Sequence, residues 1–213
     1  MNTTLSILAL AALAMLPLSA AAQTVSFSDT PLGTLPAVFQ SSLTGEGSIG
    51  EWKIIADPTA AGGRALAQTS TDRTDYRFPL AIYQPVSAKD IEVTAHFKPA
   101  AGQVDQAAGI ALRLQTPDDY YVVRANALED NVRFYRMVKG KREMIIGKNV
   151  KVASGQWHTL TLHAQGDQFT VTYDGQPLFT VGNTTFLDAG KVALWTKADS
   201  VTYFDRIEIR QLP

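Results

Sequence analysis

The sequence predicts an all-β protein in which two antiparallel sheets form a jelly-roll sandwich. From Val25 onward, apolar and polar residues alternate with a period of two, and no stretch shows the apolar repeat of a helix. Turn-forming residues interrupt these runs at short intervals, as at 117–119 and 166–167. Many short strands without crossover helices are typical of a jelly roll rather than of a seven-stranded immunoglobulin-like domain.

Each predicted strand is a β-branched or aromatic run between two such breakers. The predicted strands cover residues 25–28, 52–56, 65–69, 80–84, 91–98, 108–115, 120–125, 132–138, 142–147, 157–164, 168–173, 178–181, 191–195 and 201–210. Neither an internal repeat nor a linker divides the chain, so residues 23–213 are predicted to form one domain.

Two hairpins are marked most clearly. Asp174-Gly175 is a favoured type I′ turn dipeptide, and it stands between alternating runs over 169–173 and 176–181. The second hairpin joins 120–125 to 132–138 through residues 126–131, and its strands are unusually rich in arginine and tyrosine.

The first residues predict a secretory signal peptide over 1–22. Residues 5–22 form an uncharged apolar run that contains Pro17 and ends in small residues, which favours cleavage before Gln23. A retained transmembrane anchor is the alternative, because the run approaches the ~18–20 residues that cross a bilayer. We expect a periplasmic or secreted protein with no membrane anchor after cleavage, since no cysteine is available for lipid attachment.

The composition argues against several classes of function. The 19 Lys and Arg residues balance 20 Asp and Glu residues, so the formal net charge of −1 provides no basic field for nucleic acid. The absence of cysteine excludes disulfides, cysteine-ligated zinc, iron–sulfur clusters and thiol nucleophiles. The sequence leaves the oligomeric state open.

The hairpin between residues 120 and 138 carries the most informative set of polar residues. Arginine and asparagine supply donors to sugar hydroxyls, and tyrosine offers an apolar face to a pyranose ring. The predicted substrate-binding residues of this hairpin are Arg124, Asn126, Asn131, Arg133 and Tyr135. The alternative is a solvated sheet face with ordinary cross-strand pairs of arginine and glutamate.

A short loop between the last two predicted strands supplies two further candidates. Lys197 and Asp199 are predicted to lie at the rim of the same site. The alternative for Asp199 is that its side chain caps the turn. No metal site is predicted from the histidines, because His158 and His163 lie five positions apart and therefore on opposite faces of one strand.

Several segments spread over the mature chain resemble a known family. These segments are 27–36, 87–93 with 96–97, 126–133, 155–158 and 190–205. In them the sequence is similar to the 3-keto-disaccharide hydrolase-like domain family, which is itself similar to the concanavalin A-like lectins and glucanases. The resemblance implies a concanavalin A-like jelly roll with a carbohydrate ligand. It also raises a structural calcium at Asp29 and Asp205 as an alternative to a domain without cofactors.

The same resemblance implies a hydrolase that acts on 3-keto glycosides, although the E-x-D-x-x-E pattern of laminarinase-type glucanases is missing. A ketone at C3 acidifies the C2 proton, so cleavage can proceed by elimination and hydration. Glu129 is then the candidate base, and Arg124 or Arg133 the candidate partner of the ketone oxygen. A non-catalytic carbohydrate-binding module and a cell-envelope interaction protein remain alternatives.

Overall fold

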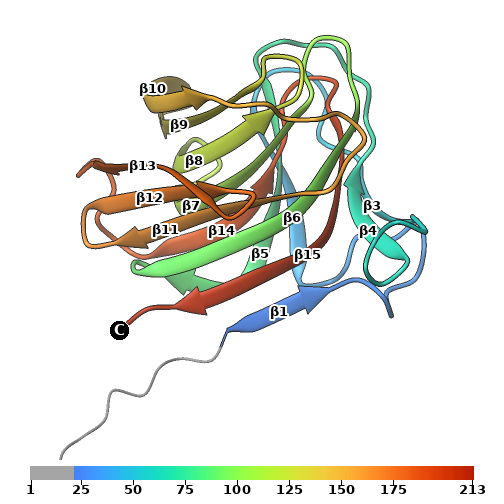
Figure 1. The fold of residues 1–213 in the computed structure, drawn as a ribbon, viewed down its shortest axis with the longest axis horizontal. Helices are drawn as coiled ribbons and strands as arrows, with labels where there is room; N and C mark the ends of the chain where they lie inside the picture. Colours follow the sequence, from blue (N-terminus) through green and yellow to red (C-terminus); the bar gives the residue numbers. More distant parts are fainter. Residues whose placement is uncertain (1–21) are drawn as a thin grey trace, which may run out of the picture.

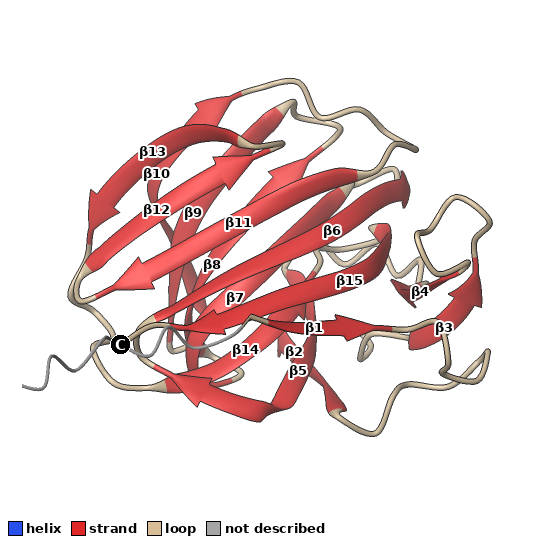
Figure 2. Cartoon of the chain, turned by 60° about the horizontal axis from the view of Figure 1, so that its bottom comes forward, coloured by secondary structure: helices blue, strands red, loops and turns tan. Residues whose placement is uncertain are grey.

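The computed structural model describes residues 22–213, which form fifteen strands (Figure 1). The predicted signal peptide lies outside the described residues except for Ala22. No helix capable of spanning a membrane occurs among residues 22–213. Figure 2 shows strands joined only by loops and turns, which confirms the predicted all-β sandwich.

The eight-stranded sheet follows the order β13-β12-β11-β6-β15-β4-β3, and β1 pairs with β15 beside this path. Its strands are β1 (Gln23–Ser26), β3 (Trp52–Ala56), β4 (Arg64–Gln68), β6 (Ile91–Ala101), β11 (His158–Gln165), β12 (Gln168–Tyr173), β13 (Gln176–Gly182) and β15 (Val201–Gln211). All of these pairings are antiparallel.

The seven-stranded sheet follows the order β10-β9-β8-β7-β14-β5-β2 and is also antiparallel. Its strands are β2 (Phe39–Gly45), β5 (Arg77–Ala88), β7 (Ala107–Thr116), β8 (Asp119–Asn126), β9 (Asn131–Val138), β10 (Lys141–Asn149) and β14 (Gly190–Trp195). The central places in the two sheets belong to late segments of the chain, because β14 lies between β7 and β5 while β15 lies between β6 and β4.

The main core fills the space between the sheets. Phe97 and Leu162 from the eight-stranded sheet belong to the same buried cluster as Val123 and Phe134 from the seven-stranded sheet. Residues with the opposite parity on each strand face outward, as the period of two requires. Burial of this apolar surface provides the main stabilisation of the sandwich.

A second buried cluster covers the outer face of the seven-stranded sheet, the face turned away from the other sheet. Trp195 stacks on Phe78 with ring centroids 5.3 Å apart, and its Nε1 donates to the hydroxyl of Tyr120 at 3.2 Å. The middle of this sheet is therefore apolar on both faces, and polar side chains gather toward β8, β9 and β10.

Two details of the strand prediction were wrong. Strand β2 was not predicted, because its sequence FQSSLTG lacks apolar alternation; only Phe39 and Thr44 of this edge strand are buried. Pro99 was predicted to end a strand, but β6 continues to Ala101. Pro99 lies beside the bulge between Val201 and Thr202, where the ladder is already interrupted and its missing donor is tolerated.

Candidate functional site

The β8–β9 hairpin brings the predicted residues together on the outer face of the seven-stranded sheet. Arg124 lies opposite Arg133 in the register, and Asn126 lies opposite Asn131. This face also carries Tyr135, which lies opposite Val122. Strict alternation along both strands explains the shared face, because the pairing of β8 with β9 has no bulge.

Arg124 is the centre of a buried polar network. Only 3% of the residue is exposed. Its guanidinium donates to Asn131 Oδ1 at 2.9 Å, to Glu129 Oε2 at 2.7 Å and to the hydroxyl of Tyr135 at 3.2 Å. Arg124 was predicted to contact a ligand; in the structure its guanidinium is nearly buried and holds Glu129, Asn131 and Tyr135 in place.

Glu129 is the exposed end of this network, with 48% of its side chain accessible. Partial burial opposes ionisation, but hydrogen bonds from Asn131 and Arg124 outweigh it and hold the pKa of Glu129 below its ordinary value. An ionised carboxylate is thus fixed at the surface, where it can accept hydrogen bonds from hydroxyl groups.

Asn126, another predicted ligand contact, is fully buried. Its Nδ2 donates to Asp105 Oδ1 at 2.7 Å, and its Oδ1 accepts from the amide of Leu128 at 2.9 Å. Asn126 therefore shapes the hairpin loop and joins it to the loop after β6.

Asp105 links the hairpin to the loop between β14 and β15. Lys197 Nζ lies 3.0 Å from Asp105 Oδ2 and 2.5 Å from Asp75 Oδ1. Burial raises the pKa of Asp105, against the opposing effect of Lys197 and Arg124. Sequence reasoning missed Asp105, because no local pattern distinguishes it from other loop aspartates.

The side chain of Asp199 accepts hydrogen bonds from three backbone amides of the loop after β6. Its Oδ2 accepts from the amide of Gln103 at 2.8 Å, and its Oδ1 accepts from the amides of Val104 and Asp105 at 3.0 Å each. Burial opposes ionisation, but these amides outweigh it and lower the pKa of Asp199. The geometry fits the capping role that was the alternative for this residue, applied to a neighbouring loop.

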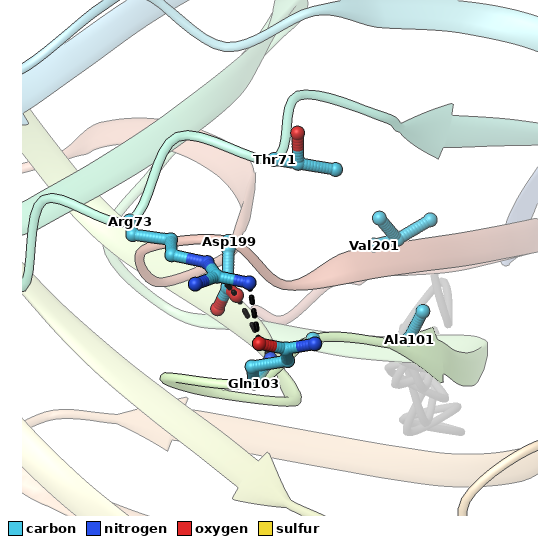
Figure 3. Close-up of a pocket in the computed structure, with 7 residues that line it drawn as sticks. Thr71, Arg73, Ala101, Gln103, Asp199 and Val201 are labelled. Atoms are coloured by element: carbon cyan, nitrogen blue, oxygen red, sulfur yellow. Dashed lines mark hydrogen bonds and ion pairs between the residues drawn. The ribbon is translucent and has the colours of Figure 1, made fainter.

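A small pocket opens beside Asp199 and the loop after β6 (Figure 3). It has a volume of about 240 Å³ and is lined by Thr71, Arg73, Ala101, Gly102, Gln103, Asp199 and Val201. Figure 3 shows Arg73 reaching toward Gln103 and Asp199, and Arg73 Nε lies 3.9 Å from Asp199 Oδ2. Of the predicted site residues, only Asp199 lines this pocket. The sequence did not predict this pocket, because the residues that line it come from three segments that are far apart in the chain.

Arg133 and Arg142 extend the polar face toward the sheet edge. Arg133 Nη2 donates to Asn149 Oδ1 at 2.7 Å, and its side chain crosses Gly147, where an added Cβ would lie 2.2 Å from Arg133 Cδ. The guanidinium carbon of Arg142 lies 4.7 Å from the ring centroid of Tyr135. Sequence reasoning missed Arg142, because its contact with Tyr135 crosses from β10 to β9 and no local pattern records it.

The predicted calcium pair is not assembled as a cluster. Asp205 is buried, accepts from the amide of Ala61 at 3.0 Å and lies 2.7 Å from His96 Nδ1, whereas Asp29 is exposed. Across residues 22–213, no three His, Cys, Asp or Glu side chains converge in a metal-binding arrangement.

Three solved structures illustrate the fold similarity. The carbohydrate binding module CBM66 from Bacillus subtilis has a TM-score of 0.63 at 16% identity, over 79% of this chain and 95% of that one. A Bacteroides ovatus GH16 protein, in complex with a G4G4G3G product, has a TM-score of 0.62 at 13% identity, over 88% and 99%. The Crh5 transglycosylase has a TM-score of 0.60 at 16% identity, over 92% and 86%.

These structural similarities show the fold alone, and they match the predicted jelly-roll sandwich. No curated protein matches the sequence. The family model described as the galactocerebrosidase C-terminal lectin domain matches residues 80–212, which include the β8–β9 hairpin, Lys197 and Asp199. The chain therefore belongs to the galactocerebrosidase C-terminal lectin domain family.

Proposed function

We propose that this protein binds carbohydrate on the outer face of the seven-stranded sheet, where Glu129 and Arg133 are accessible and the nearly buried Asn131 and Tyr135 lie beside them. The observation that carries the proposal is the buried guanidinium of Arg124, which fixes the surrounding acceptors and donors before any ligand arrives. Rigid polar groups lose little conformational entropy on binding and fix the orientation of a sugar. Membership of a lectin-domain family supports the proposal.

Carbohydrate binding is tested by titration calorimetry of the purified protein against a panel of oligosaccharides. Glu129→Gln should weaken binding by about tenfold, because a charged acceptor is lost from the site. Glu143→Gln is the matched control, since Glu143 of β10 is similarly exposed and pairs with Arg136 of β9 on the opposite face of the sheet. Equal binding by the parent and the Glu129→Gln variant would place the ligand elsewhere.

Hydrolysis of 3-keto glycosides is the second candidate function. The observation that favours it is the ionised carboxylate of Glu129, half exposed beside the cationic guanidinium of Arg124. Such a carboxylate can remove the proton next to a ketone, and Arg133 can stabilise the charge that develops on the ketone oxygen.

The test of this second function is release of monosaccharide from a 3-keto disaccharide. An enzyme should lose turnover in the Glu129→Gln variant with less effect on binding of the intact disaccharide. If the parent protein releases no sugar but binds it, the protein is a binding module. A protein that instead uses this face to bind another envelope protein would bind no sugar at all.

A further inference from the structure

We infer that the bound carbohydrate carries a negative charge, as a uronate carboxylate or a sulfate ester, and that Arg133 and Arg142 bind that charge. This inference rests on the proposed function and adds the class of ligand. It follows from an excess of guanidinium groups on one face of the sheet, where β8, β9 and β10 lie side by side.

The first observation is a pair of like charges in direct register. Arg124 and Arg133 are cross-strand partners, an arrangement that costs free energy unless anions lie nearby. Glu129 compensates only Arg124, at 2.7 Å. The partner of Arg133 is the neutral amide oxygen of Asn149, and no ion pair involves Arg133 in the described part of the chain.

Arg142 adds a third guanidinium on the same face of the sheet, toward the other end of β9, where it lies opposite Met137. It lies over two aromatic rings, 4.7 Å from the centroid of Tyr135 and 4.9 Å from that of Phe78. Among residues 22–213 it has no carboxylate partner. Stacking on both rings fixes the plane of the guanidinium and leaves its N–H groups available for a planar anion.

The second observation concerns two buried N–H donors that have no hydrogen-bond acceptor among residues 22–213. Arg124 Nε and Arg142 Nη1 are both buried and find no acceptor within the described chain. Buried donors in proteins nearly always have a partner, so two such donors near Tyr135 indicate a place where a ligand supplies acceptor oxygens. A carboxylate or a sulfate has several such oxygens, whereas a sugar hydroxyl provides a weaker, uncharged acceptor.

The remaining groups are compatible with an anionic sugar. The charge of Glu129 is balanced by Arg124, so it does not repel the ligand strongly. Met144 lies opposite Tyr135 in the register, and its side chain is largely exposed. This thioether offers an apolar contact for a pyranose ring while the arginines bind its acidic substituent.

The experiment compares matched ligands by titration calorimetry of the full protein at two salt concentrations. The ligands are an oligogalacturonate, a neutral galacto-oligosaccharide of the same length and a sulfated galacto-oligosaccharide. We expect at least one acidic ligand to bind about tenfold more tightly than the neutral one, with the preference decreasing as salt increases. The tighter of the two acidic ligands identifies carboxylate or sulfate as the group recognised.

Variants assign the charge preference to individual side chains. Arg133→Gln and Arg142→Gln should each weaken binding of the acidic ligand about tenfold more than binding of the neutral ligand, and so remove most of the preference. Arg136→Gln is the matched control, because Arg136 lies on the same strand but on the opposite face, where it pairs with Glu143. Thermal unfolding of each variant separates a loss of binding from a loss of fold, and Arg133→Gln alone suffices if Arg142→Gln unfolds.

The outcomes distinguish this inference from the proposed function. Equal affinity for the acidic and neutral ligands would overturn the inference and leave carbohydrate binding intact. A preference that survives both arginine variants would also overturn it. If none of the three ligands binds, and a wider neutral panel also fails, the proposed function itself is wrong.

Discussion

Lys197 and Asp105 form a nearly buried ion pair, with 3.0 Å between Lys197 Nζ and Asp105 Oδ2. The pair joins the loop after β14 to the loop after β6, and Asn126 attaches the β8–β9 hairpin to the same carboxylate. Asp199 holds the second of these loops through three amides. The candidate site is thus supported by contacts between residues nearly a hundred positions apart.

Removal of Lys197 should destabilise the protein through Asp105. Lys197→Met leaves a buried carboxylate without its cation, so we expect a loss of about 3 kcal/mol in the free energy of unfolding at neutral pH. Lys148→Met, at an exposed position of β10, should change the free energy by less than about 0.5 kcal/mol. Urea unfolding measures both values.

The pH dependence of the Lys197→Met variant has a definite sign. Burial raises the pKa of Asp105, so ionisation of Asp105 costs stability as the pH rises from the pKa of the unfolded chain to that of the folded protein. Lys197 reduces this cost. The difference between variant and parent should therefore be largest at neutral pH and shrink in acid, and a difference that grows in acid would contradict this account.

Asp199→Asn should loosen the loop over residues 102–106. Asparagine has one acceptor oxygen, whereas both carboxylate oxygens of Asp199 accept backbone amides, so we expect a loss of about 2 kcal/mol near neutral pH. Because the pKa of Asp199 is lowered, its contribution is present above the pKa of the unfolded chain and lost as the pH falls through the folded pKa. Faster hydrogen exchange at the Gln103 amide, but not after Asp188→Asn, would confirm the role.

Gly147→Ala should move the side chain of Arg133. The new Cβ would lie 2.2 Å from Arg133 Cδ, which forces this flexible side chain off its path to Asn149. We expect a loss of about 1–3 kcal/mol in the free energy of unfolding, because the Cβ would also lie 2.9 Å from the backbone oxygen of Val132, together with a clear loss of affinity for an acidic glycan. In the Arg133→Gln background the same substitution should have no further effect on affinity, as a double-mutant cycle would show.

Export of the protein remains a prediction from residues 1–22. Protein recovered from its natural host should begin at Gln23 and occur in the periplasm or the medium. N-terminal sequencing of the recovered protein checks this. An intact Met1 in the membrane fraction would instead support the transmembrane anchor.

Alternation along strands predicted both the fold and the grouping of Arg124 and Arg133 on one hairpin, because a period of two depends only on local sequence. Strand β2 escaped prediction because its outward residues are polar and its core contacts are few. The burial of Arg124 escaped prediction for a different reason: burial depends on which loops cover a strand end, and no local pattern records that.

The contacts that support the site could not be read from the sequence for the same reason. Asp105 and Lys197 come together only through the packing of two loops. Arg142 lies over Tyr135 through a contact that crosses from β10 to β9, and Phe78 of β5 lies against the same guanidinium. Local sequence patterns therefore identified candidate site residues, whereas the roles of these residues depend on packing between distant segments of the chain.

The central positions of β14 and β15 also have a consequence for synthesis on the ribosome. Each sheet consists of two separated halves until residues 190–211 have left the exit tunnel, because these strands join β7 to β5 and β6 to β4. The chain must therefore stay incompletely paired until these two strands are available, with unpaired strand edges that chaperones would have to shield. A premature stop codon before Gly190 would leave neither sheet able to close, so such fragments should be degraded rather than accumulate as a smaller domain.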